Sequence, residues 1–284
     1  MAAAFRVGWG LGQGRAAMTR VDYSSAFYAG QSQASELSAE VVVPLLLKVT
    51  EAASVVDVGC GIGTWLAVFA RHGVSTRLGL DGEYVTPEML MISPDDYWPM
   101  DLAAPTSVDR RFDLVLCLKV GEHLPGEKAG QFVRLLTGLG PVVRFSAAIP
   151  SQEGTGHVNE RWPDYWAELF DQQGYRQIDV IRGSIWDDDR VAVAYAQNMI
   201  LYLAPAKYGE LCRRTDGLVD PGGRRVVQPC LHESKLRTPD FRSYAPPSLV
   251  RAIGSSACVL ATSTGALPVS VRRCGRRRRT AQAS

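Results

Sequence analysis

A glycine-rich loop between an apolar run and an amphipathic segment constrains this chain more than any other feature. The run Val55–Val58 contains Asp57 and leads directly into Gly59-Cys60-Gly61-Ile62-Gly63, after which Thr64-Trp65-Leu66 begins a helical pattern. Glycines at alternate positions let the backbone turn tightly and let a ligand lie against it, at the positive end of the following helix. The sequence therefore predicts a strand, a ligand-binding loop and a helix, in that order.

The same alternation of apolar runs and amphipathic segments continues along most of the chain. The predicted strands are Val55–Val58, Leu78–Leu80, Phe112–Leu118, Val142–Phe145, Ile178–Ile181 and Met199–Leu203. The predicted helices are 35–51, with a kink or division at Pro44, and Trp65–Arg71, Gly126–Leu136 and Trp162–Gln173, which end near Gly73, Gly138 and Gly174. This order is typical of an α/β fold with a mostly parallel sheet and helices on both faces.

Charge divides the chain into two unlike parts. Residues 206–284 carry 15 basic and 5 acidic side chains, a net charge of +10, whereas residues 1–205 have a net charge of −8. No apolar period is sustained after Pro205. The sequence predicts a flexible extension over 1–17, a folded domain over 18–205 and a mostly disordered basic tail over 206–284, which is either an unstructured extension or a contact for nucleic acid or another anionic surface.

Several classes of protein are disfavoured by what the sequence lacks. No apolar stretch approaches the ~20 residues of a membrane-spanning helix, and the N-terminus has no continuous apolar core of a secretory signal. We therefore expect a cytoplasmic protein. The six cysteines form no CxxC pair and show no zinc-ligand spacing, and the three acids Asp187-Asp188-Asp189 are more typical of a solvated turn. The sequence predicts reduced thiols and no metal site.

The glycine loop also indicates the class of ligand. A dinucleotide fingerprint, G-x-G-x-x-G, would need glycine at position 64, where this chain has Thr64, and Asp57 would repel a pyrophosphate. A cationic or zwitterionic ligand fits better. Asp57, Gly59, Gly61 and Gly63 after a hydrophobic strand match D-x-G-x-G-x-G, and in this the chain resembles the class I S-adenosylmethionine-dependent methyltransferases.

The resemblance extends over residues 18–205 and implies a Rossmann-like, doubly wound sheet of seven strands, mostly parallel with the last antiparallel. It also implies that S-adenosylmethionine is the cofactor. Leu78-Gly79-Leu80-Asp81 is an apolar run that ends in an acid. By the resemblance, Asp81 accepts hydrogen bonds from the ribose hydroxyls, and Asp101 and Leu102 lie near the adenine ring.

A second match is Phe112-Asp113-Leu114-Val115 followed by Glu122-His123, which resembles the fourth-strand motif F-D-L-V-x-x-x-E-V-x-E-H-x-x of small-molecule-type bacterial branches. The match places Glu122 and His123 beside the sulfonium methyl, with His123 either a general base or a brace of the backbone. The chain departs from the motif at Lys119, where glutamate is usual, and at Gly121, where a larger residue is common.

A third match is His157-Val158-Asn159-Glu160-Arg161-Trp162-Pro163-Asp164-Tyr165-Trp166, which resembles the H-x-N-E-x-W-P-x-Y-W segment of a bacterial subgroup of these enzymes. The glycine-rich stretch before it suggests a lid over the ends of the strands. His157 becomes a catalytic candidate, and Asn159 and Trp162 become candidates for substrate contact. The alternative for Trp162, Tyr165 and Trp166 is the core face of a helix.

Together these matches predict transfer of a methyl group from S-adenosylmethionine to a small-molecule acceptor by in-line displacement. O- or N-methylation is favoured, with a sugar, lipid-linked or natural-product acceptor. One alternative is a nucleic-acid methyltransferase that uses the basic tail, although the chain lacks an N/D-P-P-Y/F/W motif and its acidic domain would repel a polyanion. Another, motivated by Lys119, is a cofactor-binding regulatory protein without turnover. The oligomeric state is left open.

Overall fold

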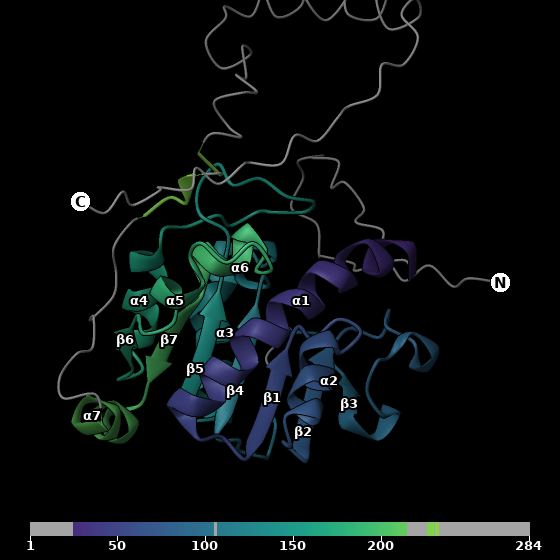
Figure 1. The fold of residues 1–284 in the computed structure, drawn as a ribbon, viewed down its shortest axis with the longest axis horizontal. Helices are drawn as coiled ribbons and strands as arrows, with labels where there is room; N and C mark the ends of the chain where they lie inside the picture. Colours follow the sequence, from purple (N-terminus) through teal and green to yellow (C-terminus); the bar gives the residue numbers. More distant parts are fainter. Residues whose placement is uncertain (1–24, 105–106, 215–225, 230, 233–284) are drawn as a thin grey trace, which may run out of the picture. The chain divides into compact units, whose positions relative to one another are not determined.

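The computed structural model describes residues 25–104, 107–214, 226–229 and 231–232. All of them belong to one compact unit, Met1–Glu233, and the second unit, Ser234–Ser284, contains no described residue. The described residues form one sheet with helices packed on both of its faces (Figure 1). The predicted extension over 1–17 and most of the predicted tail lie outside the described residues.

Seven strands form the sheet: β1 Ser54–Val58, β2 Thr76–Asp81, β3 Tyr97–Pro99, β4 Leu114–Leu118, β5 Val142–Ser146, β6 Arg176–Ile178 and β7 Ile200–Leu203. Their spatial order is β3-β2-β1-β4-β5-β7-β6. β1 pairs in parallel with both β2 and β4, whereas β7 runs antiparallel to β5 and β6. The predicted Rossmann-like, doubly wound sheet with an antiparallel last strand is confirmed. The chain order reverses between β1 and β4, the place where such sheets bind ligands.

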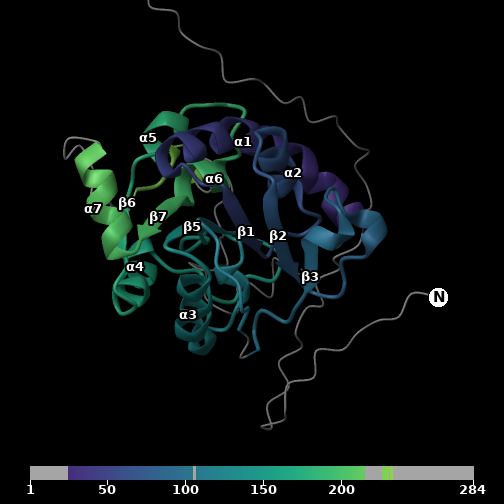
Figure 2. The same cartoon turned by 90° about the horizontal axis from the view of Figure 1, so that it is seen from below.

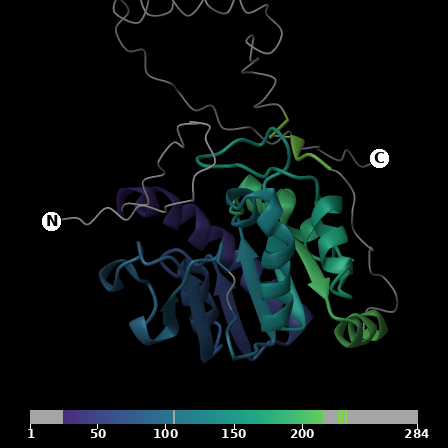
Figure 3. The same ribbon diagram turned by 180° about the vertical axis from the view of Figure 1, so that it is seen from behind.

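The helices are α1 Ser25–Thr50, α2 Thr64–Arg71, α3 Ala129–Leu139, α4 Pro163–Asp171, α5 Arg182–Ile185, α6 Val193–Asn198 and α7 Pro205–Arg214. Short 3-10 turns are η1 Pro87–Met89, η2 Pro94–Asp96, η3 Gly121–His123 and η4 Gly126–Lys128. Seen from below, α1, α2, α5 and α6 lie on one side of the sheet, with α3 and α4 on the other (Figure 2). The view from behind shows α3 across the second face (Figure 3).

Each face of the sheet buries its own apolar cluster. Along β4, Leu114 and Leu116 pack with α1 and α2, whereas Val115 and Cys117 pack with α3 and α4. Alternate side chains of a strand point to opposite faces, so a strand covered on both sides is apolar throughout. This burial fixes where along the sheet each strand ends. It thereby positions the loops that follow β1, β2 and β4 at one edge of the sheet.

Two of the predicted helices differ clearly from the structure in their bounds. The first helix begins at Ser25 rather than at 35, and it runs through Pro44 without division. Val42, Val43 and Leu46 on it are fully buried, so packing around the proline offsets the hydrogen bond that Pro44 cannot donate. The helix predicted over Gly126–Leu136 covers Ala129–Leu139 instead, because residues 126–128 form the 3-10 turn η4 and the buried Leu139 extends the helix to its C-cap, Gly140.

The prediction of a strand over 178–181 is also wrong, because β6 ends at Ile178. Asp179 Oδ2 accepts a hydrogen bond from Arg182 Nε at 2.6 Å, and this short-range pair begins a turn of helix instead. The boundary at 205 is too early as well. Residues 205–214 form α7, and its Leu211 joins the core cluster of α1 and α2.

None of the helices in the described ranges is both long and apolar enough to cross a membrane.

Replacement of Phe170 by alanine tests the second core. Phe170 is fully buried and stacks on Tyr202 with ring centroids 3.8 Å apart. We expect Phe170→Ala to lower the free energy of unfolding by about 3–5 kcal/mol in urea titrations. Glu168→Ala, at an exposed position of the same helix, should change it by less than about 0.5 kcal/mol. Equal losses in the two variants would contradict the packing described.

Candidate functional site

The glycine loop after β1 is confined on two sides. Gly59 and Gly63 have φ angles of 82° and 83°, in the left-handed region that favours glycine. A Cβ atom at Gly59 would lie 2.2 Å from Cγ2 of Val120, and one at Gly63 would lie 2.8 Å from Cγ1 of Ile92. Both glycines are therefore required by backbone conformation and by space. The loop is a cradle between the residues that follow β4 and the segment around Ile92.

Two buried carboxylates flank this loop. Asp57 in β1 is 2% exposed and Asp81 at the end of β2 is 4% exposed. Asp81 accepts hydrogen bonds from the backbone N–H groups of Gly61 and Gly82, each at 2.7 Å, and from the hydroxyl of Tyr84. Asp57, in contrast, has no hydrogen-bond partner for its carboxylate among the residues that the structure describes.

Burial determines the protonation of this pair. It raises the pKa of Asp57 to about 7, and the neighbouring charge of Asp81 adds to the effect. Burial also raises the pKa of Asp81, although its hydrogen bonds from Tyr84, Gly82 and Gly61 oppose that shift. A buried carboxylate without a partner is costly unless a cation or a donor arrives. The loop region therefore fits a ligand that brings positive charge and hydroxyl groups.

Asp101 and Leu102 follow β3 at the same edge of the sheet. The backbone N–H of Met100 donates to the carbonyl of Asp81 at 2.7 Å and so holds the end of β3 beside the end of β2. Asp101 is exposed, and its Oδ1 accepts a hydrogen bond from the N–H of Ala103 at 2.9 Å. Leu102 packs its side chain against the cluster of α3. Contact of these two residues with an adenine ring stays a prediction.

Lys119, the departure from the resembled motif, begins the loop after β4. Its φ is 62°, an unfavourable value for a residue with a side chain, and its N–H donates to the carbonyl of Ser146 at 3.0 Å. Its Nζ lies 5.7 Å from the centroid of the Tyr195 ring, where a cation is stabilised by the aromatic face. The other departure, Gly121, has a packing reason, because a Cβ there would lie 2.9 Å from Trp166 and 3.0 Å from Phe145.

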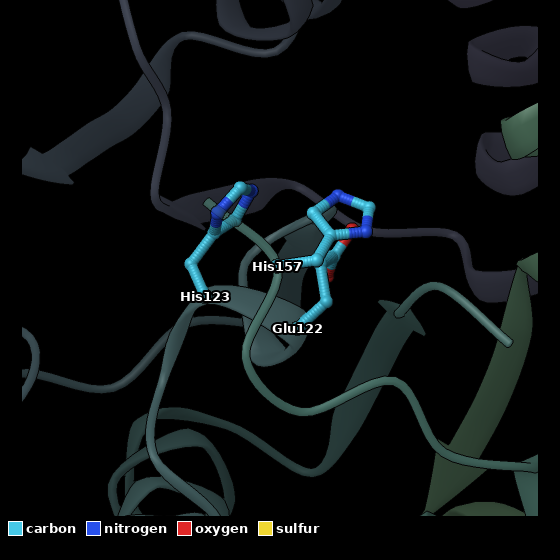
Figure 4. A group of neighbouring side chains, drawn as sticks. All are labelled: Glu122, His123 and His157. Atoms are coloured by element: carbon cyan, nitrogen blue, oxygen red, sulfur yellow. The ribbon is translucent and has the colours of Figure 1, made fainter. Parts of the chain in front are cut away.

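The three predicted catalytic side chains come together, as Figure 4 shows. Glu122 and His123 lie in η3 and His157 in the loop before α4, and one ligand atom from each lies within 4.8 Å of the others. The His123 and His157 rings are 5.0 Å apart at an interplanar angle of 82°. His157 Nδ1 lies 2.8 Å from Glu160 Oε1, and His123 Nδ1 lies 3.3 Å from the carbonyl oxygen of Gly156.

Burial shifts two of these groups away from their charged forms. It raises the pKa of Glu122 to about 7, and it lowers the pKa of His123 to about 4, assisted by the neighbouring His157. His123 is therefore a neutral imidazole at neutral pH, with one ring nitrogen that carries a lone pair. The cluster can accept a proton or ligate an ion.

The two predicted substrate residues have different surroundings. Asn159 is 3% exposed; its N–H donates to the carbonyl of Glu122 at 3.0 Å, and its Oδ1 accepts from Arg161 Nε at 3.0 Å. Asn159 Nδ2 is buried and has no partner within the described ranges. Trp162 is half-buried at the N-cap of α4. Trp166 packs in the core 4.8 Å from the Phe145 ring, as expected for the core face of a helix.

Three polar contacts of the site were missed by the sequence analysis. Tyr84 donates to Asp81, Tyr195 faces Lys119, and Glu160 accepts from His157. Only Glu160 carried a usable signal, because it lies three residues after His157 in the segment already singled out. Tyr84 and Tyr195 lie outside every motif, and their roles follow from the fold alone.

Comparison with known families agrees with this geometry. The profile of a methyltransferase domain matches residues 31–129, which run from α1 through the glycine loop, Asp81 and η3 to the first residue of α3. A comparison with curated protein sequences gives no match.

The solved structures to which this chain is similar include the Streptomyces venezuelae protein DesVI, at 18% identity and a TM-score of 0.49, with 66% of this chain and 100% of that chain covered. The sugar N-methyltransferase KedS8 from Streptoalloteichus sp. ATCC 53650 is 15% identical, with a TM-score of 0.49 and coverage of 72% and 98%. Magnesium protoporphyrin IX methyltransferase (ChlM) from Synechocystis PCC 6803, with bound S-adenosylhomocysteine, is 17% identical, with a TM-score of 0.43 and coverage of 66% and 89%.

Replacement of Asp57 by asparagine tests the cost of its burial. The folded-state pKa of about 7 lies above the ordinary value of 3.8, so the folded protein holds a proton that the unfolded chain loses. Wild-type stability should therefore fall as pH rises from about 4 to about 7 and stay level above that. We expect Asp57→Asn to raise the free energy of unfolding at pH 8 by roughly 1–3 kcal/mol and to change it less at pH 5.

The measurement is urea unfolding at both pH values. Asp109→Asn, which changes an exposed acid, should behave as the wild type at each. A gain from Asp57→Asn that is equal at pH 5 and pH 8 would contradict an ionised, unpartnered carboxylate in the folded protein.

Proposed function

We propose that this chain, which carries a class I S-adenosylmethionine-dependent methyltransferase domain, transfers the methyl group of that cofactor to an oxygen or nitrogen atom of a small-molecule acceptor. One observation carries the cofactor side of the proposal. Asp57 and Asp81 are buried beside a glycine loop with no space for a Cβ at Gly59 or Gly63, and Asp57 has no hydrogen-bond partner of its own in the described chain. S-adenosylmethionine has a sulfonium, an ammonium and two ribose hydroxyls, which can supply positive charge and hydrogen-bond donors to the two carboxylates.

On the cofactor side, each residue has a role that follows from its chemistry. Asp81 accepts hydrogen bonds from the ribose hydroxyls, as a carboxylate with two oxygens can. Asp57 and the loop Gly59, Gly61 and Gly63 hold the methionine portion, with the carboxylate offsetting its positive charge. Asp101 and Leu102 lie at the neighbouring strand end, where an adenine ring would extend from the ribose.

On the acceptor side, Glu122, His123 and His157 bind the nucleophile and receive its proton where it is a hydroxyl. The new bond forms between acceptor and methyl carbon while the carbon–sulfur bond breaks, and the electron pair of that bond stays on sulfur. Because the sulfonium supplies the reactivity, the protein contributes mainly alignment, which can lower a barrier by several kcal/mol. Asn159 and Trp162 orient the acceptor.

A small acceptor is supported by the surroundings of these groups. Glu122 and Asn159 are almost completely buried, and the backbone of residues 158–159 crosses over η3, where it bonds to the Glu122 carbonyl. The acidic charge of residues 1–205 also disfavours a polyanionic acceptor. A sugar, lipid-linked or natural-product acceptor fits these constraints, and a cytoplasmic location is the matching expectation.

Calorimetric titration of the full chain with S-adenosylmethionine and S-adenosylhomocysteine tests the cofactor site. We expect micromolar binding by the wild type and a loss of at least about 100-fold for Asp81→Ala, because two charge-assisted hydrogen bonds disappear. Glu83→Gln removes the same charge from an exposed position two residues away and should bind as the wild type. Wild-type binding that Asp81→Ala leaves intact would refute the assigned site.

Methyl transfer itself is followed with labelled S-adenosylmethionine and panels of small acceptors, with RNA and DNA alongside. Label in small molecules is the expected result. Label confined to nucleic acid would replace the proposal with the polymer alternative. Tight cofactor binding without transfer to any panel would favour a regulatory protein, for which Lys119 is the motivating residue.

Replacement of Tyr84 by phenylalanine tests whether its hydroxyl competes with the cofactor. That hydroxyl donates to Oδ1 of Asp81, the atom that a ribose hydroxyl needs. Tyr84→Phe should therefore strengthen S-adenosylmethionine binding about fivefold, the equivalent of one ordinary hydrogen bond. Calorimetry on Tyr97→Phe, which removes a hydroxyl that donates to the Gly82 carbonyl instead, provides the comparison. Weaker binding by Tyr84→Phe would mean that the hydroxyl contacts the cofactor directly.

A further inference from the structure

The group formed by Glu122, His123 and His157 has the composition of a metal site. Two imidazoles and one carboxylate converge from η3 and the loop before α4 (Figure 4). Two histidines with one carboxylate hold Zn²⁺ or Fe²⁺ in many enzymes and leave further coordination positions open. Ligand atoms about 2.1 Å from a tetrahedral ion lie about 3.4 Å from one another. The ligand atoms of the three residues now lie within 4.8 Å of one another, so modest side-chain rotations bring them to an ion.

The surroundings of both rings orient them as ligands. His157 Nδ1 is held by Glu160 Oε1 at 2.8 Å, and His123 Nδ1 lies 3.3 Å from the carbonyl of Gly156. An acceptor at Nδ1 fixes the proton on that nitrogen and leaves the lone pair on Nε2, which is the usual arrangement of histidines that bind metals. The carboxylate beside His157 also makes its imidazole a stronger donor.

The carboxylate supplies an independent observation. Glu122 is 1% exposed, yet its Oε2 has no hydrogen-bond partner in the described part of the chain. A buried carboxylate oxygen without a donor is costly, and neither histidine donates to it here. The nearby Asn159 holds the loop in place through its N–H bond to the Glu122 carbonyl. A bound ion would provide the partner that Glu122 Oε2 lacks in the described chain.

We propose that Glu122, His123 and His157 bind one divalent transition-metal ion of the Zn²⁺ and Co²⁺ class, which receives a hydroxyl oxygen of the acceptor. The binding of the ion does not depend on the proposed function, whereas the contact between the ion and the acceptor rests on that function. This departs from the expectation, drawn from sequence, of no metal. A bound divalent ion lowers the pKa of a hydroxyl, so the site selects an oxygen nucleophile. With the ion bound, the three side chains hold the ion instead of receiving the hydroxyl proton, as they do in the metal-free protein, and that proton leaves to solvent.

Lys119 sets a limit on the affinity. Its ammonium is near enough to influence both Glu122 and His123, and a cation there weakens the binding of a second cation. The ammonium lies over the Tyr195 ring, whose aromatic face stabilises the cation. The ion is therefore expected to exchange with solvent rather than to be permanently held.

The test uses the full chain, freed of metal with a chelator and titrated with CoCl₂ alone. Wild-type protein should bind one Co²⁺ with a visible absorption band that the variants His123→Gln and His157→Gln lack. Glu122→Gln should weaken binding at least about tenfold. His72→Gln is the matched control, because His72 also faces a carboxylate, Glu40 at 3.6 Å, but has no third ligand in the groups found among described residues.

Circular dichroism melts establish that each variant is folded, and the two histidine variants, at less buried positions, carry the test if Glu122→Gln does not fold. Co²⁺ binding that is the same in the wild type and in the folded histidine variants would overturn the site. The cofactor titration is run on the same samples. Metal binding without S-adenosylmethionine binding would support the metal site and refute the proposed function. Methyl transfer that is unaffected in variants without the Co²⁺ band would support the proposed function and refute the binding of the acceptor to the ion.

Discussion

The contact between Gly59 and Val120 joins the two halves of the site. β1 and β4 are paired in parallel from Val55 with Leu114 to Asp57 with Leu116, so both end at one edge of the sheet. There the glycine loop lies so close to Val120 that no other residue fits at position 59. Val120 is flanked by Lys119 and Gly121, and η3 begins with the latter. A displacement of the glycine loop is therefore expected to move Val120 and η3 with it, so a substitution on one side of the candidate site affects the other.

The sequence predicted the central part of the fold well for a physical reason. Strands buried on both faces are apolar throughout, and the glycine loop permits few other structures, so β1, β4 and their order were evident. The errors fall where tertiary packing overrides local preference. Pro44 lies within an unbroken helix because the turns around it are buried, and α7 forms beyond 205 because Leu211 finds a place in the core.

The sequence indicated which residues of the candidate site lie together, but not the contacts that they make. Motif spacing brought Asp57, Asp81 and Glu122 to one edge, since the ends of neighbouring parallel strands meet there. No spacing could indicate that Tyr84 folds back onto Asp81, or that Tyr195 from a helix near the end of the domain faces Lys119. Such contacts join residues far apart in sequence or depend on one rotamer, so they follow only once the whole chain is folded.

Under the proposed function, electrostatics favours binding of the substrate form of the cofactor over its product form. S-adenosylmethionine carries one more positive charge than the thioether product. The buried Asp57, which has no hydrogen-bond partner among the described residues, interacts with that charge at low dielectric. The reaction removes the charge that made binding favourable, so the product is held less tightly than the substrate at the same contacts. In this proposal Asp57 destabilises the empty protein and discriminates between substrate and product, which gives a reason for burying so costly a group beside the loop.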